Sequence, residues 1–368
     1  MSFEKREFIK GNEAIAYGSL KAGLNAYFAY PITPSSEIPE TLAKEFGSPA
    51  YPKFKCFLQA ASELEAINMV IGAASTGAKV MTATSGPGFS LKQEGLSYAA
   101  GMELPFLVVN VNRAGPGLGN LGPEQSDYFQ ATKGGGHGGH RNVVLAPDSV
   151  QEMASFPRMG FSLAFKYRNP VVILADAFLG QLKEDIVFPD IEEDKFDTSD
   201  WATTGSGSHL DRHVLNSLHL EFELQSQHSE HLMKKYADIE RSEQRSESYL
   251  TDDAELILVA YGISARLCRH VVNALRSEGE VRVGLFRPIT LFPFPSSALR
   301  ELALSGNRKR EFIVVELNMG QMLYDVRLAT ADTGRKVSLV NKLGGLLPTS
   351  LEIEKKVREE KEGITQYV

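Results

Sequence analysis

Two stretches decide the fold of this 368-residue chain: Tyr30-Pro-Ile-Thr-Pro-Ser-Ser-Glu37 and, further on, Ser62-Glu-Leu-Glu-Ala-Ile67. The prolines of the first stretch fix φ and withhold ladder hydrogen bonds, so it is expected to be a loop that leaves a strand and exposes Thr33 at the strand's carboxyl end. In the second stretch, Ser62 and Glu65 have the spacing of a capping box, which predicts a helix with the intervening glutamate in its first turn. The sequence therefore offers a hydroxyl that can hold a small ligand and a carboxylate aimed at a cleft.

Strand and helix patterns alternate on both sides of these stretches. The strands lack polar alternation, which is typical of strands buried on both faces of a parallel sheet with helices on either side. We expect strands at residues 26–30, 79–84, 105–111, 142–145 and 171–175, and helices at 13–22, 36–45, 62–77, 91–102 and 149–165.

The character of the chain changes at about residue 191, where a polar and charged segment begins. This segment predicts an extended connection followed by an exposed helix at about 220–247. A second alternation then predicts strands at 255–260, 281–286, 312–315 and 336–340, and helices at 264–276, 297–305 and from 320. We therefore expect an α/β protein with two parallel-sheet domains, at 1–190 and 253–368, and a charged, partly helical linker at 191–252.

Composition excludes several classes of function. With 43% hydrophobic and 23% charged residues the chain is typical of soluble globular proteins, and a net charge of -7 gives no basic field for nucleic acid. No apolar run is long enough for a membrane span, and the first residues lack the apolar region of a signal peptide, so a cytoplasmic protein is expected. Two cysteines, Cys56 and Cys268, cannot hold an iron-sulfur cluster with four thiolate ligands, so any cluster must lie on another chain.

Three glycine clusters suggest phosphate sites. Gly117-x-Gly119-x-x-Gly122 matches the dinucleotide fingerprint, but Pro123 follows where a helix should begin, which argues against a nicotinamide site. Ser85-Gly-Pro-Gly88 lacks the lysine of a P-loop and predicts a tight strand-to-helix turn. The glycine-rich run that contains His137 and His140 either bends over a ligand or is mobile, and without a third ligand nearby no metal site is expected.

Two charged residues remain as candidates for chemistry. Glu63 has the position of a glutamate that activates thiamine diphosphate, although an acid in a first helical turn is also simply stabilising. Arg113 follows a strand at the edge where parallel sheets bind ligands, so it either clamps a substrate carboxylate or forms a surface ion pair. No Gly-Asp-Gly occurs in the chain, so the magnesium-anchored diphosphate pocket of such enzymes is absent and the chain holds half of a thiamine site.

Taken jointly, the motifs resemble the large, pyrimidine-binding subunit of multisubunit 2-oxoacid:ferredoxin oxidoreductases from about Lys10 to Thr349. The resemblance implies a thiamine diphosphate pyrimidine-binding fold followed by a transketolase C-terminal-like domain. The motifs are Gly11-Asn-Glu-Ala-Ile15, Tyr30-Pro-Ile-Thr-Pro-Ser35, Ser62-Glu63, Thr84-Ser-Gly-Pro-Gly88, Arg113 with Gln125-Ser-Asp127, Leu145-Ala-Pro147, Arg287-Pro-Ile-Thr290 and Pro293-Phe-Pro295.

The same resemblance implies a reaction in which a 2-oxoacid, coenzyme A and oxidised ferredoxin give acyl-CoA, carbon dioxide and reduced ferredoxin. A partner beta subunit would hold the diphosphate and magnesium, a delta-type subunit the iron-sulfur clusters, and a small gamma subunit would complete the complex. The implied residues are Glu63, Thr33 and Arg113 for catalysis, Glu63, Thr33, Ser85 and Gly86 for the cofactor, and Thr33, Arg113, Gln125 and Asp127 for the substrate.

The loop after Arg113 bears on the substrate. Relatives that use 2-oxoglutarate commonly have Gly-Gly-Pro-Ser-Thr-Gly there, whereas this chain has Ala-Gly-Pro-Gly-Leu-Gly119, which together with the run Asp127–His137 resembles enzymes that act on branched-chain 2-oxoacids. An apolar substrate needs no second cation, and Leu118 would suit it. We expect 2-oxoisovalerate, with 2-oxoglutarate, pyruvate and aromatic 2-oxoacids as alternatives. A non-catalytic docking subunit and a dinucleotide-dependent dehydrogenase are the alternatives from other classes.

Overall fold

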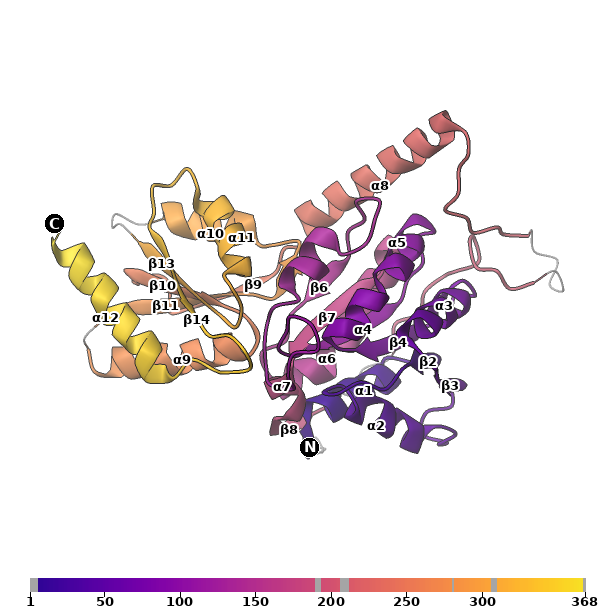
Figure 1. The fold of residues 1–368 in the computed structure, drawn as a ribbon, viewed down its shortest axis with the longest axis horizontal. Helices are drawn as coiled ribbons and strands as arrows, with labels where there is room; N and C mark the ends of the chain where they lie inside the picture. The colour runs from indigo at the N-terminus through magenta and orange to yellow at the C-terminus, as the bar shows by residue number, and fades with distance from the viewer. Residues whose placement is uncertain (1–5, 189–192, 206–211, 280, 306–309, 367–368) are drawn as a thin grey trace.

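The computed structural model describes residues 6–188, 193–205, 212–279, 281–305 and 310–366. Within these residues the chain forms two α/β units that lie side by side, with a long helix projecting beside the first of them (Figure 1). The expected domain boundary at 190–191 and the first residues, 1–5, lie outside the described residues.

The first unit is built around a parallel sheet. Helix α1 packs on α6, which contacts β5 and β7, whereas α3 packs on α5 and contacts β2 and β4 on the other face of the sheet (Figure 1). The elements are β1 (Arg6–Lys10), α1 (Gly11–Lys21), β2 (Ala26–Ala29), α2 (Glu37–Glu45), β3 (Cys56–Gln59), α3 (Glu63–Ala74), β4 (Val80–Thr84), α4 (Gly86–Leu91), α5 (Gln93–Gly101), β5 (Leu107–Asn112), the π-helical turn η1 (Gln130–Gly134), β6 (Val143–Leu145), α6 (Val150–Tyr167), β7 (Val171–Asp176), α7 (Ala177–Gln181) and β8 (Lys183–Val187).

The second unit follows a long connection and is built around a smaller sheet. Helix α8 (Phe222–Ser242), with Ile239 its one buried residue, confirms the exposed helix expected in the connection. The remaining elements are β9 (Ser246–Tyr249), β10 (Leu256–Ala260), α9 (Gly262–Ser277), β11 (Val283–Pro288), β12 (Thr290–Phe292), α10 (Ser296–Leu304), β13 (Glu311–Glu316), α11 (Gln321–Thr330), β14 (Val337–Asn341) and α12 (Ser350–Gln366).

The strand orders confirm the expected α/β class. The larger sheet has the order β12-β6-β7-β5-β4-β2-β3 and the smaller one β14-β13-β10-β11-β9. All neighbours within these two sheets are parallel except the edge strands β12 and β9. The sequence did not predict either edge strand: β9 lies in the expected linker and is polar, and β12 lies between prolines.

Strand β12 pairs with β6, so a segment after the first strands of the second unit returns to the sheet of the first unit. Next to it, the buried guanidinium of Arg287 on β11 forms an ion pair with Glu152 at the start of α6 and donates to the carbonyl of Ala146. The motif Arg287–Thr290 thus holds the two units together.

Gln125 makes a second connection between the units. Its side-chain Nε2 donates to the carbonyl of Tyr261 (2.9 Å), and its Oε1 accepts from the backbone N–H of Leu317 (2.9 Å). Gln125 is 2% exposed, so these bonds are shielded from water. The amide therefore satisfies two backbone groups of the second unit.

We expect Gln125→Ala to lower the free energy of unfolding by about 2–6 kcal/mol, because each of the two buried backbone groups left unpaired costs about 1–3 kcal/mol. Chemical denaturation of the purified complex measures the change. The matched control is Gln227→Ala on the exposed face of α8, with an expected change within about 0.5 kcal/mol. Equal effects of the two variants would show that Gln125 does not stabilise the contact between the units.

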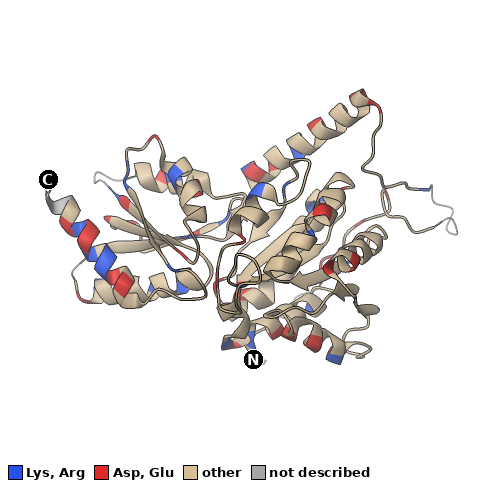
Figure 2. Cartoon of the chain, in the orientation of Figure 1, with Lys and Arg blue, Asp and Glu red and all other residues tan. Residues whose placement is uncertain are grey.

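The two signs of charge are mixed along two of the helices. Figure 2 shows Lys and Arg interspersed with Asp and Glu along α8 and α12. Among the described helices, none has the length and apolar character that crossing a membrane requires.

Candidate functional site

The candidate residues gather where the strand order of the larger sheet reverses. From β2 the chain continues to β3 on one side and then to β4 on the other, and ligands of such sheets bind at the carboxyl ends of the strands beside this point. Thr33 follows β2, Glu63 follows β3, and Ser85 and Gly86 follow β4. Arg113 follows β5, the next strand along.

Ser62 is the N-cap of α3, as the capping-box spacing predicts. Its Oγ accepts from the backbone N–H of Glu65 (3.2 Å). The Glu65 carboxylate in turn accepts from the N–H of Ala61 (2.9 Å), one residue before the position expected for a capping box. The cap fixes Glu63 as the first residue of the helix.

The Glu63 side chain is 5% exposed, and the described residues offer its carboxylate no hydrogen bond or ion pair. It lies against Gly88, where a Cβ atom would come within 2.5 Å of Glu63 Oε1 and 2.3 Å of Thr84 Oγ1. The hydroxyls of Thr84 and Ser85 are also buried without a hydrogen-bond partner among the described residues. Buried polar groups are normally paired, so this group of acceptors and donors fits a polar ligand.

We expect Gly88→Ala to weaken binding of thiamine diphosphate by tenfold or more, because the added methyl group would displace the Glu63 carboxylate or the Thr84 side chain. A fluorescence titration of the cofactor-stripped complex measures the dissociation constant. The control is Gly72→Ala in α3, where the new Cβ meets nothing within 4 Å and the helix gains about 0.5–1 kcal/mol. Unchanged binding in Gly88→Ala would place the ligand elsewhere.

Arg113 and Thr33 are in direct contact. Nη1 of Arg113 donates to the backbone carbonyl of Thr33 (2.8 Å), and Nη2 donates to the carbonyl of Leu118 at 3.4 Å. The alternative of a surface ion pair is wrong, since Arg113 is 8% exposed and no carboxylate among the described residues pairs with it. Its Nε has no partner there either, which leaves the guanidinium with donor capacity for a ligand.

Arg113 also lines a cleft of about 860 Å³ between the two units. The first unit supplies residues from both ends of α4 and the loops after β5, and the second supplies residues after β13 and β14. Its apolar lining is Pro87, Leu91, Pro116, Met319 and Leu343.

Two carboxylates complete the polar lining of this cleft. Asp127 accepts from Asn110 Nδ2 (2.8 Å), and burial raises the pKa of its carboxyl. Glu124 accepts from the backbone N–H of Gly115 (2.9 Å) and from that of Gly344 (2.8 Å), so it binds both walls. Of the residues that line the cleft, Arg113 is the one cation.

The structure corrects two expectations about this site. Gln125 does not line the cleft, because its amide is engaged between the units, so the predicted contact with substrate has no support here. Leu118 is 83% exposed and does not line the cleft. Sequence reasoning missed Glu124 and the wall formed by Asn318, Met319 and Gln321. The wall follows the buried strand β13, which indicates an edge that binds ligands but not that this edge faces the first unit.

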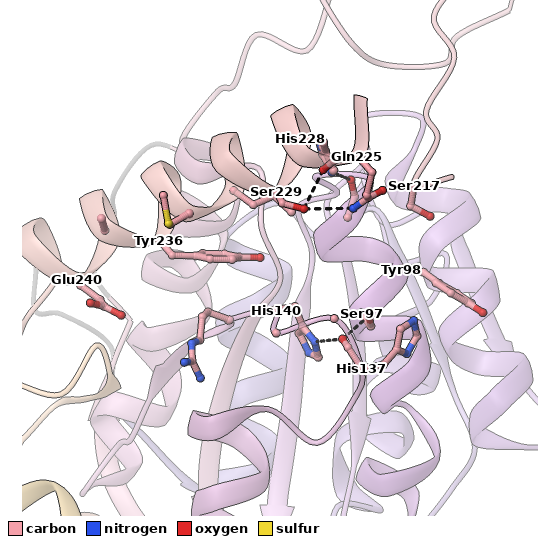
Figure 3. A pocket seen from close by; sticks show the side chains of 17 residues that line it. Ser97, Tyr98, His137, His140, Ser217, Gln225, His228, Ser229, Tyr236 and Glu240 are labelled. Carbon is pink, nitrogen blue, oxygen red and sulfur yellow. Dashed lines mark hydrogen bonds between the residues drawn. The ribbon is translucent and has the colours of Figure 1, made fainter. Parts of the chain in front are cut away.

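A second cleft, of about 520 Å³, lies between α5, the glycine-rich run and α8 (Figure 3). There, Nδ1 of His140 lies 3.2 Å from the carbonyl of His137, and burial lowers the pKa of the His140 imidazole. The His137 carbonyl also accepts from Ser97 Oγ (2.8 Å), so the run folds against α5. Among the described residues there is no group of three or more His, Cys, Asp or Glu that could hold a metal ion.

The sequence itself matches known proteins along most of its length. Residues 17–248 match the thiamine diphosphate-binding domain of pyruvate flavodoxin/ferredoxin oxidoreductases, and residues 254–353 match core domain II of pyruvate:ferredoxin oxidoreductase. The chain is 51% identical to the ketoisovalerate oxidoreductase subunit VorB of Methanothermobacter thermautotrophicus, over 96% of this chain and 97% of that one. It is 36% identical to the 2-oxoglutarate synthase subunit KorA of Methanocaldococcus jannaschii, over 96% of this chain and 99% of that one.

Solved structures agree with the fold. The 2-oxoglutarate:ferredoxin oxidoreductase of Magnetococcus marinus, with 2-oxoglutarate, coenzyme A and succinyl-CoA bound, superposes with a TM-score of 0.85 and 28% identity over 97% of this chain. The chain spans 65% of the length of that protein. A split-gene transketolase has the same fold, with a TM-score of 0.59 at 13% identity. The chain belongs to the pyruvate flavodoxin/ferredoxin oxidoreductase family, as an alpha-type subunit of a 2-oxoacid:ferredoxin oxidoreductase with a thiamine diphosphate-binding domain.

Proposed function

We propose that this chain activates thiamine diphosphate in a cytoplasmic complex that oxidatively decarboxylates a branched-chain 2-oxoacid, with 2-oxoisovalerate as the preferred substrate. The products are acyl-CoA, carbon dioxide and reduced ferredoxin. The observation that carries the proposal is the unpaired, buried Glu63 carboxylate at the switch point of the larger sheet. The 51% identity to VorB supports the choice of substrate.

The residues present fit the cofactor. The Glu63 carboxylate is free to hydrogen-bond the aminopyrimidine ring, and Gly88 leaves the room that this contact needs. Thr33 follows β2, and Ser85 and Gly86 follow β4, at the same edge of the sheet as Glu63. When bound, thiamine diphosphate would supply a nucleophilic carbon for the 2-oxoacid carbonyl and an electron sink for the negative charge that departing carbon dioxide leaves behind.

Arg113 would hold the substrate carboxylate, since its guanidinium keeps donor capacity at the wall of the cleft. Glu124 and Asp127 face the same cleft and disfavour a second carboxylate, whereas Pro87, Leu91 and Met319 offer apolar contacts. These linings favour an isopropyl group over the carboxyethyl group of 2-oxoglutarate.

The missing half of the thiamine site calls for partners. We propose a beta subunit that brings the diphosphate pocket with magnesium, a small gamma subunit and a delta-type subunit with iron-sulfur clusters that passes electrons to ferredoxin. Absence of Gly-Asp-Gly and of cysteine clusters in the sequence supports this division of labour.

The test is reduction of methyl viologen or ferredoxin by the anaerobically co-purified complex, with coenzyme A and either 2-oxoisovalerate or 2-oxoglutarate. We expect kcat/KM to be at least tenfold higher with 2-oxoisovalerate, a difference of about 1.4 kcal/mol in binding the transition state. A preference for 2-oxoglutarate would overturn the assignment of substrate while keeping the class. Complete inactivity of a thiamine-loaded complex would favour the docking-subunit alternative, and protection by NAD(H) against thermal unfolding would favour a dehydrogenase.

A further inference from the structure

A buried lysine lies directly behind the cofactor-activating glutamate. Lys92 lies at the junction of α4 and α5, where it is both the C-cap of α4 and the N-cap of α5. Its side chain is 0% exposed, although lysine is almost never fully buried unless it is paired. The lysine therefore needs an electrostatic partner.

Glu63 is the electrostatic partner that the structure offers to the Lys92 ammonium. Nζ of Lys92 lies 3.5 Å from the backbone carbonyl of Glu63, which is the single hydrogen-bond acceptor that the described residues offer it. At this length the bond is weak, so it cannot by itself satisfy three ammonium donors. The Lys92 ammonium has no salt bridge among the described residues. The side-chain carboxylate of Glu63, the residue whose carbonyl it contacts, has no hydrogen bond among them either.

The two groups are also held in place by rigid elements. Glu63 is fixed by the Ser62 cap at the start of α3, and Gly88 in α4 lies against its carboxylate. Lys92 follows directly after α4, and α5 packs on α3 through Gly95 against Ile67. The ammonium thus cannot move to solvent without opening the contact between α3 and α5.

Electrostatics agree with the geometry. Burial lowers the pKa of the Lys92 ammonium to about 8, and the negative charge of Glu63 acts against that lowering. The interaction is mutual, so the buried positive charge of Lys92 attracts the Glu63 carboxylate. An ionised carboxylate is the form that accepts a hydrogen bond from a protonated ring nitrogen.

We propose that Lys92 is a positioning residue, whose buried positive charge beside Glu63 attracts its carboxylate and orients it for the aminopyrimidine ring of thiamine diphosphate. The role rests on the proposed function of Glu63. Lys92 acts only through Glu63 and touches neither the substrate nor the diphosphate.

The test is a double-mutant cycle on binding of thiamine diphosphate to the cofactor-stripped complex, with Lys92→Met, Glu63→Gln and the double variant. Methionine keeps the length and apolar contacts of the stem and removes the charge. We expect Lys92→Met to weaken binding about tenfold, because the attraction between the buried charge and the Glu63 carboxylate is lost, and to have no further effect in the Glu63→Gln background. Exchange of the cofactor's C2 proton for deuterium, followed by NMR, should slow by a similar factor.

Two further variants separate the possible explanations. Lys92→Gln retains an N–H donor but no charge, so it should behave as Lys92→Met does, and it replaces that variant if methionine prevents assembly. Lys234→Met on the exposed face of α8 is the control and should change neither binding nor exchange.

Each outcome is distinct. The role of Lys92, but not that of Glu63, would be overturned if Lys92→Met weakened cofactor binding equally in the wild-type and Glu63→Gln backgrounds. The same holds if Glu63→Gln weakened binding and Lys92→Met did not. Unchanged binding and exchange in Glu63→Gln itself would overturn the proposed function on which that role rests.

Discussion

A complex that carries Glu63→Gln should lose at least about 100-fold in 2-oxoacid-dependent reduction of ferredoxin, the low end of what general acid–base groups contribute. Glutamine has nearly the same shape, so the buried site is kept, but the amide cannot carry the negative charge that the ring nitrogen requires. The unpaired state of the Glu63 carboxylate in the structure is the reason to expect that stability does not fall with activity. Steady-state turnover with methyl viologen measures the loss.

The matched control is Glu65→Gln, two residues further along the same helical turn. That carboxylate accepts from the N–H of Ala61 and faces no cleft described here, so its loss should cost about 0.5–2 kcal/mol of stability and leave turnover within about twofold. Full activity in Glu63→Gln would instead support a non-catalytic docking subunit.

Arg113→Met should raise the KM for the 2-oxoacid by about 10–100-fold, because a hydrogen bond to a charged group contributes about 1.5–3 kcal/mol. Arg113 is buried, so the variant should also destabilise the complex by about 1–3 kcal/mol, as the carbonyls of Thr33 and Leu118 lose their donors. Because Arg113 is buried, this loss of stability should exceed the change that a substitution at the surface causes.

Initial rates across substrate concentration, together with thermal unfolding, separate the two effects. The exposed Arg212, changed to methionine, serves as the control and should alter neither. If Arg113→Met lost stability while KM stayed unchanged, the residue would only support the loops around Thr33 and Leu118.

Local patterns predicted the central strands and the helices that flank them, because a strand buried on both faces needs a continuous apolar run such as Val143–Leu145 or Leu256–Ala260. The polar strand β9, the short β12 and the charged helix α12 were not predicted. Their pairing is set by partners far along the chain, such as β6 for β12, and edge strands need no apolar run.

The candidate site also has a part that the sequence could predict and a part that it could not. Glu63, Thr33, Ser85, Gly86 and Arg113 could be predicted because each follows a strand or opens a helix, and the sheet brings these ends together. The second wall of the cleft could not be predicted, since contacts such as Gln125 with Leu317 decide which loops of two separate sheets face each other. The burial of Lys92 could not be predicted, because nothing in a helical pattern distinguishes a buried lysine from a solvated one.

The central claim is that the Glu63 carboxylate holds the pyrimidine ring of thiamine diphosphate. A crystal or cryo-electron microscopy structure of the co-purified complex with the cofactor bound tests it most directly. The account predicts a Glu63 carboxylate oxygen within about 2.7–2.9 Å of a ring nitrogen, the distance of a charge-assisted hydrogen bond. A cofactor whose pyrimidine ring lies against another residue, with Glu63 out of reach, would contradict the account.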